Sequence, residues 1–270
     1  MFLPNRILAR GLALLSWPAF AADEPAPLTP EETAGSTRTD EFSMPTAGEF
    51  VTALGKSGKF DWKGKYRVAI PTSYTSRPQM ALNLGTLIAD GYVAVEAEDA
   101  QAVKNIGKDI IALAKPLGVR DRIVNRGKIF ADFADDGKWD QLKEELEATQ
   151  NEVKAEFGES QDKPLIVLVT TGGWARATEV VASHIADNYS AELAKVLRQP
   201  GIVGYLNEKL EALPEKLRDD PAVKVARKRM AELHAAVSFS RETVPTQDEV
   251  KKINALAASL VREIAKKDPK

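Results

Sequence analysis

The sequence predicts an all-α protein, an irregular bundle of about seven or eight helices that follows a disordered leader. Alanine, leucine, lysine and glutamate are abundant while aromatic residues make up only 7% of the chain, a balance that favours helices over sheets. After residue 77, apolar residues recur at three- and four-residue spacing, which is typical of helices with one buried face. The chain has no cysteine, so the fold must be held by packing without disulfides or thiolate-bound metal.

Residues 1–22 have the pattern of a secretory signal peptide. Arg6 and Arg10 precede an apolar stretch, and small residues follow at the expected cleavage site. We therefore expect cleavage near Ala21 or Ala22 and a periplasmic or secreted protein. The apolar stretch has about ten residues, half of what a bilayer-spanning helix needs, and no later stretch comes closer, so we expect no membrane span.

Removal of residues 1–22 takes away two arginines and no acid, which leaves 35 basic against 39 acidic residues and a net charge of −4. This charge argues against nucleic acid as a partner. Residues 23–48 are rich in proline, threonine and glutamate and predict a flexible leader. Residues 49–270 predict a single helical domain whose N-terminal segment, up to residue 76, is irregular because glycines interrupt its loose alternation.

Four helices are predicted in the first half of this domain. The first, 78–98, carries two apolar stripes and is expected to be central. Asp99 is the predicted cap of the second, which Pro116 and Gly118 should end. Asp121 is the predicted cap of the third. The fourth follows the glycine turn at 135–137 and has glutamate and lysine on its exposed side.

The second half predicts four more helices. A long apolar segment begins at Pro164 and is followed by 191–212, broken at Pro200-Gly201, and by 221–238 and 247–266, with Thr246 as the cap of the last. One alternative is α/β. Leu165 to Thr170 followed by Thr171-Gly172-Gly173 also fits a strand, a glycine turn and a helix, with 67–70 and 92–95 as partner strands and a ligand at the turn.

A polar stripe runs beside the apolar one on the first helix. Asn83, Thr86 and Asp90 follow one another at three- and four-residue spacing. If the helix is central these groups need partners, because an unpaired buried carboxylate is very costly, and Arg176 or Arg77 would suit Asp90. The stripe is either a buried network that sets helix register or part of a ligand pocket.

Short landmarks carry a resemblance. Asn83-Leu84-Gly85 with Ala89-Asp90, then Leu113-Ala114 with Leu117-Gly118-Val119, then Gly172-Gly173-Trp174, resemble the NLGxxxAD, LAxxLGI and GGW motifs of uncharacterised exported helical bacterial proteins. The resemblance implies helix through the double glycine and no catalytic residues. Many of those proteins carry a lipid-anchoring cysteine near the N-terminus, and this chain has no cysteine.

Glycine inside a helix costs about 1 kcal/mol relative to alanine, so the landmark glycines predict two closely approaching backbones. We expect the first and fifth helices to cross at Gly85 and Gly172-Gly173, with Trp174 sealing the crossing. Asp90 and Arg176 should meet there.

No strong signature of a catalytic, metal or cofactor site is present, and the two histidines, His184 and His234, lie fifty residues apart. The leading hypothesis is therefore a non-enzymatic protein that binds a protein or small-molecule partner, with candidate ligand residues Asn83, Asp90, Trp174 and Arg176. A second hypothesis is a hydrolase or lyase that uses carboxylates such as Asp90 and Glu179. A third is a structural envelope component that touches acidic surfaces through 224–229 or 251–270.

Overall fold

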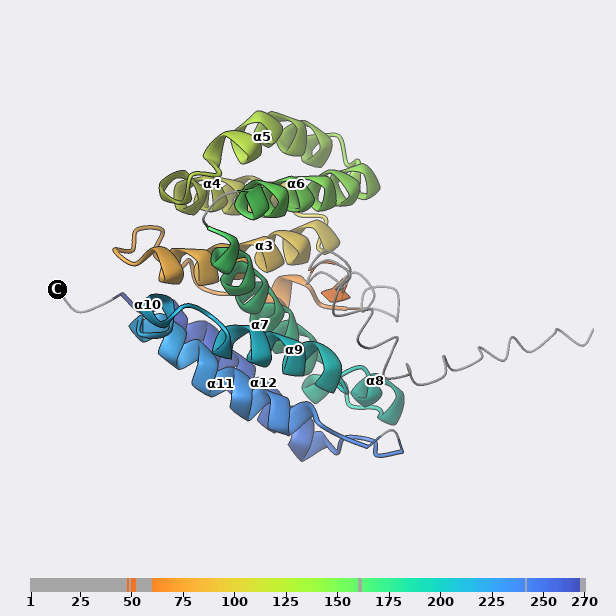
Figure 1. Ribbon diagram of the computed structural model, residues 1–270. Helices are drawn as coiled ribbons and strands as arrows, with labels where there is room; N and C mark the ends of the chain where they lie inside the picture. The colour runs from red at the N-terminus through yellow and green to blue at the C-terminus, as the bar shows by residue number, and fades with distance from the viewer. Residues whose placement is uncertain (1–47, 49, 52–59, 160–161, 241, 268–270) are drawn as a thin grey trace, which may run out of the picture. The chain divides into compact units, whose positions relative to one another are not determined.

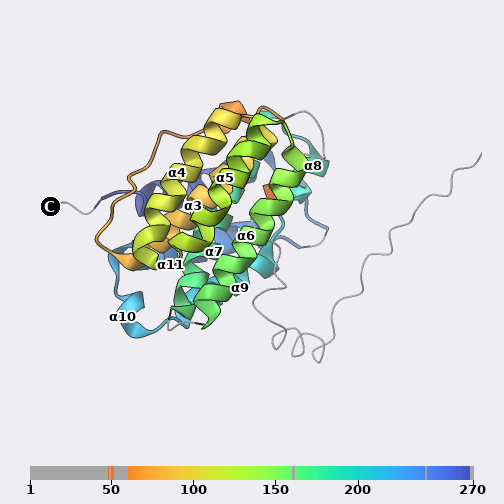
Figure 2. The same ribbon diagram turned by 90° about the horizontal axis from the view of Figure 1, so that it is seen from above.

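The computed structural model describes residues 48, 50–51, 60–159, 162–240 and 242–267 (Figures 1 and 2). Within these ranges the chain is helical and has no strand, which confirms the all-α prediction. The predicted signal peptide and residues 23–47 of the predicted leader lie outside the described residues. The elements in chain order are η1 (Lys63–Lys65), α3 (Arg77–Glu96), α4 (Ala100–Leu117), α5 (Arg120–Asp135), α6 (Trp139–Glu159), α7 (Lys163–Asp187), α8 (Ala191–Lys195), α9 (Pro200–Glu211), α10 (Glu215–Arg218), α11 (Pro221–Val237) and α12 (Gln247–Ile264).

The core is built around α3 and α7, which are buried on nearly every side. The α/β alternative was wrong, because Leu165 to Thr170 lies inside α7. The hydroxyls of Thr170 and Thr171 donate to the carbonyls four residues earlier, at 2.8 and 2.7 Å, so these polar groups are satisfied within the helix. A short apolar run of this kind fits a buried strand or a buried helix, and here it is part of a helix of 25 residues.

The crossing of α3 and α7 confirms the prediction drawn from the glycines. A Cβ atom placed on Gly85 would lie 1.9 Å from the carbonyl oxygen of Val169, and one placed on Gly172 would lie 1.9 Å from that of Leu82. These distances are far below van der Waals contact, so only glycine permits the backbones to approach so closely.

Other helices pack on both members of this pair. α12 packs against α7, and α11 packs against both α12 and α9. On the other side, α4 and α6 contact α3 (Figure 1). α5 packs on α4 and α6 and lies outermost (Figures 1 and 2). Of the described side chains of α5, Ala134 is the one that is buried. The described part of α5 is therefore mostly at the surface.

Most predicted helix ends agree with the structure. Asp99 caps α4 by accepting a hydrogen bond of 2.9 Å from the Ala102 amide, and Gly118 ends it with a φ of +88°. Pro116, however, lies inside α4 and does not end it. The prediction that Asp121 caps α5 was wrong, since the helix already begins at Arg120.

In the second half, the chain breaks between α8 and α9 before Pro200, as predicted, and Thr246 forms a capping box with Glu249. The short helix α10 was not predicted. Among the described helices, α7 alone is long and apolar enough to cross a bilayer, and 83% of its most apolar window is buried inside the protein.

Candidate functional site

Asp90 lies at the centre of a buried charged network. Its Oδ1 accepts a hydrogen bond from Nε of Arg176 at 2.6 Å, and its Oδ2 accepts one from Nε of Arg67, also at 2.6 Å. The predicted contact between Asp90 and Arg176 is therefore present. The second partner is Arg67 rather than Arg77, which instead pairs with Asp162 at 2.8 Å. Both carboxylate oxygens of Asp90 are engaged by cations.

The two arginines tie this network to neighbouring elements. Arg176, only 3% exposed, also donates to Glu179 at 2.9 Å and to the Lys65 carbonyl at 2.6 Å. Burial alone would lower the pKa of the Arg176 guanidinium, but the charges of Asp90 and Glu179 and the hydrogen bonds to them raise it overall. Nη2 of Arg67 donates to the hydroxyl of Thr86 at 2.7 Å. The network thus joins α3, α7 and the segment before α3.

The other two candidate residues lie apart from Asp90. The side-chain amide of Asn83 donates to the Gln79 carbonyl at 2.9 Å and to the Ile264 carbonyl at 2.7 Å, and so holds the end of α12. Trp174 stacks on Phe50 with ring centroids 5.0 Å apart. Its indole nitrogen is buried and has no hydrogen-bond partner in the described part of the chain. The role of the four residues in ligand binding stays a prediction.

A small cavity of about 200 Å³ reaches Asp90 from the side of α4. Arg67, Asn105 and Asp109 also line it, so a second carboxylate faces the same space. Burial raises the pKa of the Asp109 carboxyl. Asp90 is therefore both neutralised by arginines and adjacent to this cavity.

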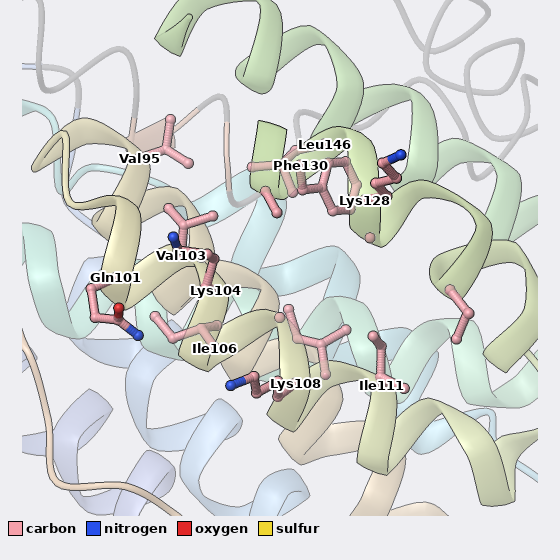
Figure 3. Close-up of a pocket in the computed structure, with 16 residues that line it drawn as sticks. Val95, Gln101, Val103, Lys104, Ile106, Lys108, Ile111, Lys128, Phe130 and Leu146 are labelled. Atoms are coloured by element: carbon pink, nitrogen blue, oxygen red, sulfur yellow. The ribbon is translucent and has the colours of Figure 1, made fainter. Parts of the chain in front are cut away.

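A larger cavity of about 510 Å³ lies between α4 and α5 (Figure 3). Its lining is predominantly apolar, and the side chains come from four helices, with α4 and α5 on facing sides and α3 and α6 closing the space. The labelled apolar members are Val95, Val103, Ile106, Ile111, Phe130 and Leu146. The volume and the apolar lining are those of a small-molecule pocket.

Two glycines on facing helices keep this cavity open. A Cβ atom added to Gly107 of α4 would meet no atom within 4 Å, and one added to Gly127 of α5 would meet only Ile111, at an ordinary 3.8 Å. Neither glycine has a positive φ, so neither is required by the backbone conformation. Their absent side chains leave space in the cavity and serve no close contact between helices.

The polar part of the lining is basic. It consists of Gln101 and three lysines, Lys104, Lys108 and Lys128, and no carboxylate lines the cavity among the described residues. Lys104 is paired with Asp135 at 2.6 Å. Lys108 and Lys128 are exposed and form no hydrogen bond or ion pair with any described residue.

His184 of α7 lies against an aromatic ring. His184 stacks on Phe60 with ring centroids 3.9 Å apart. Burial and, second, the charge of Lys65 lower the pKa of His184, against the opposing effect of Asp187. Within the described ranges, no group of three or more histidine, aspartate or glutamate side chains is placed to hold a metal ion.

The basic stretch at 224–229 is largely neutralised by its own chain. Lys224 pairs with Asp219 at 3.1 Å, Arg227 pairs with Glu211, and Arg229 bridges to Glu232 and Glu263 at 2.7 Å each. These pairs give no support to a docking surface for acidic partners.

No protein family, curated protein or solved structure matches this chain. The resemblance to exported helical proteins therefore stays a prediction.

Two parts of the site escaped sequence reasoning. Arg67 lies in an irregular segment that has no helical spacing relative to Asp90, so no local pattern links them. The cavity between α4 and α5 had one usable signal. Gly107 and Gly127 each stand inside a helix far from its end, where glycine is unfavourable and needs a reason.

Proposed function

We propose that this protein is an exported, non-enzymatic binding protein that holds an apolar or amphipathic small molecule between α4 and α5. The observation that carries the proposal is the cavity of about 510 Å³ with its predominantly apolar lining. Ligand pockets in proteins have volumes of about 300 to 1,000 Å³ and bury most of their ligand against apolar side chains.

The glycines favour a pocket over a packing defect. Each helical glycine costs about 0.5 to 1 kcal/mol relative to alanine, and an unfilled apolar space lowers stability further. Helical glycines and an unfilled apolar cavity occur together between α4 and α5. Such departures from good packing are expected at functional sites.

The carboxylate chemistry considered as an alternative finds less support. A general acid or base needs an oxygen free to exchange a proton with a substrate. Both oxygens of Asp90 accept hydrogen bonds from arginines, and Glu179 is paired with Arg176. This arrangement favours a structural role for the Asp90 network.

The test is titration with N-phenyl-1-naphthylamine, a neutral apolar dye whose fluorescence rises on transfer from water to an apolar site. The wild-type protein should bind it saturably with one site per chain. The double variant Gly107→Leu/Gly127→Leu should lose this binding, because two leucine side chains enter the cavity.

A matched control is Gly201→Leu. Gly201 lies in the first turn of α9, and a Cβ atom there meets no atom within 4 Å, but it lies outside the cavity lining. This variant should bind the dye as the wild type does. Saturable binding that persists in the double variant, with a cooperative thermal transition showing that it is folded, would place the dye elsewhere and overturn the proposal. Absence of saturable binding in the wild type would also overturn it.

Export is tested separately by fractionation of bacteria that express the full chain. The protein should be recovered from the periplasm, and mass spectrometry of its N-terminus should show a chain that begins at Ala22 or Asp23. An uncleaved cytoplasmic chain would contradict the predicted signal peptide.

A further inference from the structure

We propose that the ligand of the cavity between α4 and α5 is a single-chain amphiphile with an anionic headgroup, a carboxylate or a phosphate monoester. This inference rests on the proposed function and specifies the class of ligand. Three observations carry it, namely the sign of the charges around the cavity, the free state of two of its lysines and the separation of polar from apolar lining.

The charges that border the cavity are all of one sign. Lys104, Lys108 and Lys128 line it, and no described carboxylate does. The whole chain carries a formal net charge of −2, so an all-basic border is a local departure from its average. Such a border attracts anions and disfavours cations.

Two of these lysines are available to a ligand. Lys104 is held by Asp135, but Lys108 and Lys128 form no hydrogen bond or ion pair with a described residue. They lie on different helices, α4 and α5, which face each other across the cavity. An ammonium group is a flexible point charge that can follow a headgroup of either shape, carboxylate or phosphate.

The lining separates the two halves that an amphiphile requires. Figure 3 shows the nitrogens of Lys108 and Lys128 at the edges of the group of lining side chains, while Val103, Ile106 and Phe130 contribute carbon. Lysine commonly packs its methylene stem along apolar surface and keeps its charge in water. The alkyl chain of a ligand in the cavity would therefore contact apolar side chains along its length, and its headgroup would meet positive charge at the edge of the cavity.

The experiment is displacement of bound naphthylamine dye by single-chain amphiphiles, each used below its micelle concentration. Dodecanoate and dodecyl phosphate should displace the dye at a concentration at least about tenfold lower than dodecyltrimethylammonium does, since the last has the same chain and the opposite charge. The tighter of the two anions identifies the headgroup. From octanoate to dodecanoate, affinity should rise about fourfold per methylene group, as expected for burial of the chain.

The lysines are tested with Lys108→Gln/Lys128→Gln. This variant should bind the anions about four- to tenfold more weakly, the effect of two partly exposed ion pairs, and should bind the neutral dye as before. Lys228→Gln is the control, because Lys228 is an exposed lysine of α11 outside the cavity lining. It should change neither affinity. A high salt concentration should weaken the anions and leave the dye unaffected.

The outcomes separate this inference from the proposed function. If the dye binds but the cationic and anionic chains compete equally, or the lysine variant binds the anions normally, the anionic ligand is overturned and the cavity stands. If neither dye nor amphiphile binds the wild type, both proposals fail.

Discussion

Glycines have opposite roles in two regions of this molecule. At the crossing of α3 and α7, Gly85 and Gly172 allow two backbones to touch, and a Cβ atom on either would lie 1.9 Å from a carbonyl oxygen. Between α4 and α5, Gly107 and Gly127 border open space and a cavity of about 510 Å³. The same residue type therefore marks a close backbone contact in one region and a candidate ligand site in the other. What surrounds a glycine decides its role.

Substitution at the crossing should have the largest effect. Gly85→Leu places a side chain against the backbone of α7, which cannot move aside, so we expect a loss of at least about 3 kcal/mol in the free energy of unfolding. Thermal melting followed by circular dichroism measures it. Gly107→Leu is the same substitution at a position where a Cβ atom meets no atom within 4 Å, so this variant should keep a cooperative transition. Similar melting temperatures for the two variants would contradict the different surroundings of Gly85 and Gly107.

The charged network beside the crossing should have the next largest effect. Asp90→Asn keeps the shape of the side chain but removes the counter-charge of Arg67 and one of the two counter-charges of Arg176, which is only 3% exposed. We expect a loss of about 2 kcal/mol in urea unfolding, less than complete removal of a buried partner. Glu192→Gln breaks an exposed ion pair and is the control, with no measurable change expected. Equal stability of the two variants would argue against a buried network.

The open region should respond to alanine in the opposite direction. Gly107→Ala removes the conformational cost of a helical glycine and meets no atom within 4 Å, so it should raise stability by about 0.5 to 1 kcal/mol. The readout is the urea midpoint at unchanged slope. Gly201→Ala should show a smaller gain, because Gly201 lies in the first turn of α9, and Gly172→Ala should instead be destabilising. A loss of stability in Gly107→Ala would mean that the space beside it is filled.

The smallest expected effect is a dependence of stability on pH that arises from His184 in the packed region. His184 of α7 has its pKa lowered from 6.5 by burial and by the charge of Lys65. The unfolded chain therefore takes up a proton at a higher pH than the folded chain. The contribution of neutral His184 to the free energy of unfolding is fully present above about pH 6.5. It is lost as the pH falls through the lower pKa that His184 has in the folded protein.

This pH dependence is isolated by comparing the wild type with His184→Phe. The difference in unfolding free energy between the two proteins should shift in favour of the variant from pH 7.5 to pH 5. The carboxylates are common to both proteins, so their titration cancels in this difference. A constant difference across this range would show that His184 titrates equally in both states.

Local sequence signals predicted most of the helices and the crossing of α3 and α7. Periodicity located the long helices, and capping residues such as Asp99 and Thr246 set their first turns, because these signals act within a few residues. The glycine pair at Gly85 and Gly172 predicted a close approach, and the polar spacing on α3 led to the contact between Asp90 and Arg176. Each of these inferences used local chemistry that is written directly along the chain.

Contacts between residues far apart in the chain depend on how the helices pack against one another. Leu165 to Thr170 fits strand and helix equally well in isolation, and in the structure it belongs to the 25-residue helix α7, which packs against α3 and α12. Arg67 reached Asp90 from an irregular segment, which no periodicity anticipates. The cavity depends on how far α5 stands from α4, a distance set by side chains of four helices at once. The distance between two packed helices follows from the sum of many contacts. The cavity beside Gly107 and Gly127 therefore could not be predicted from these two residues alone.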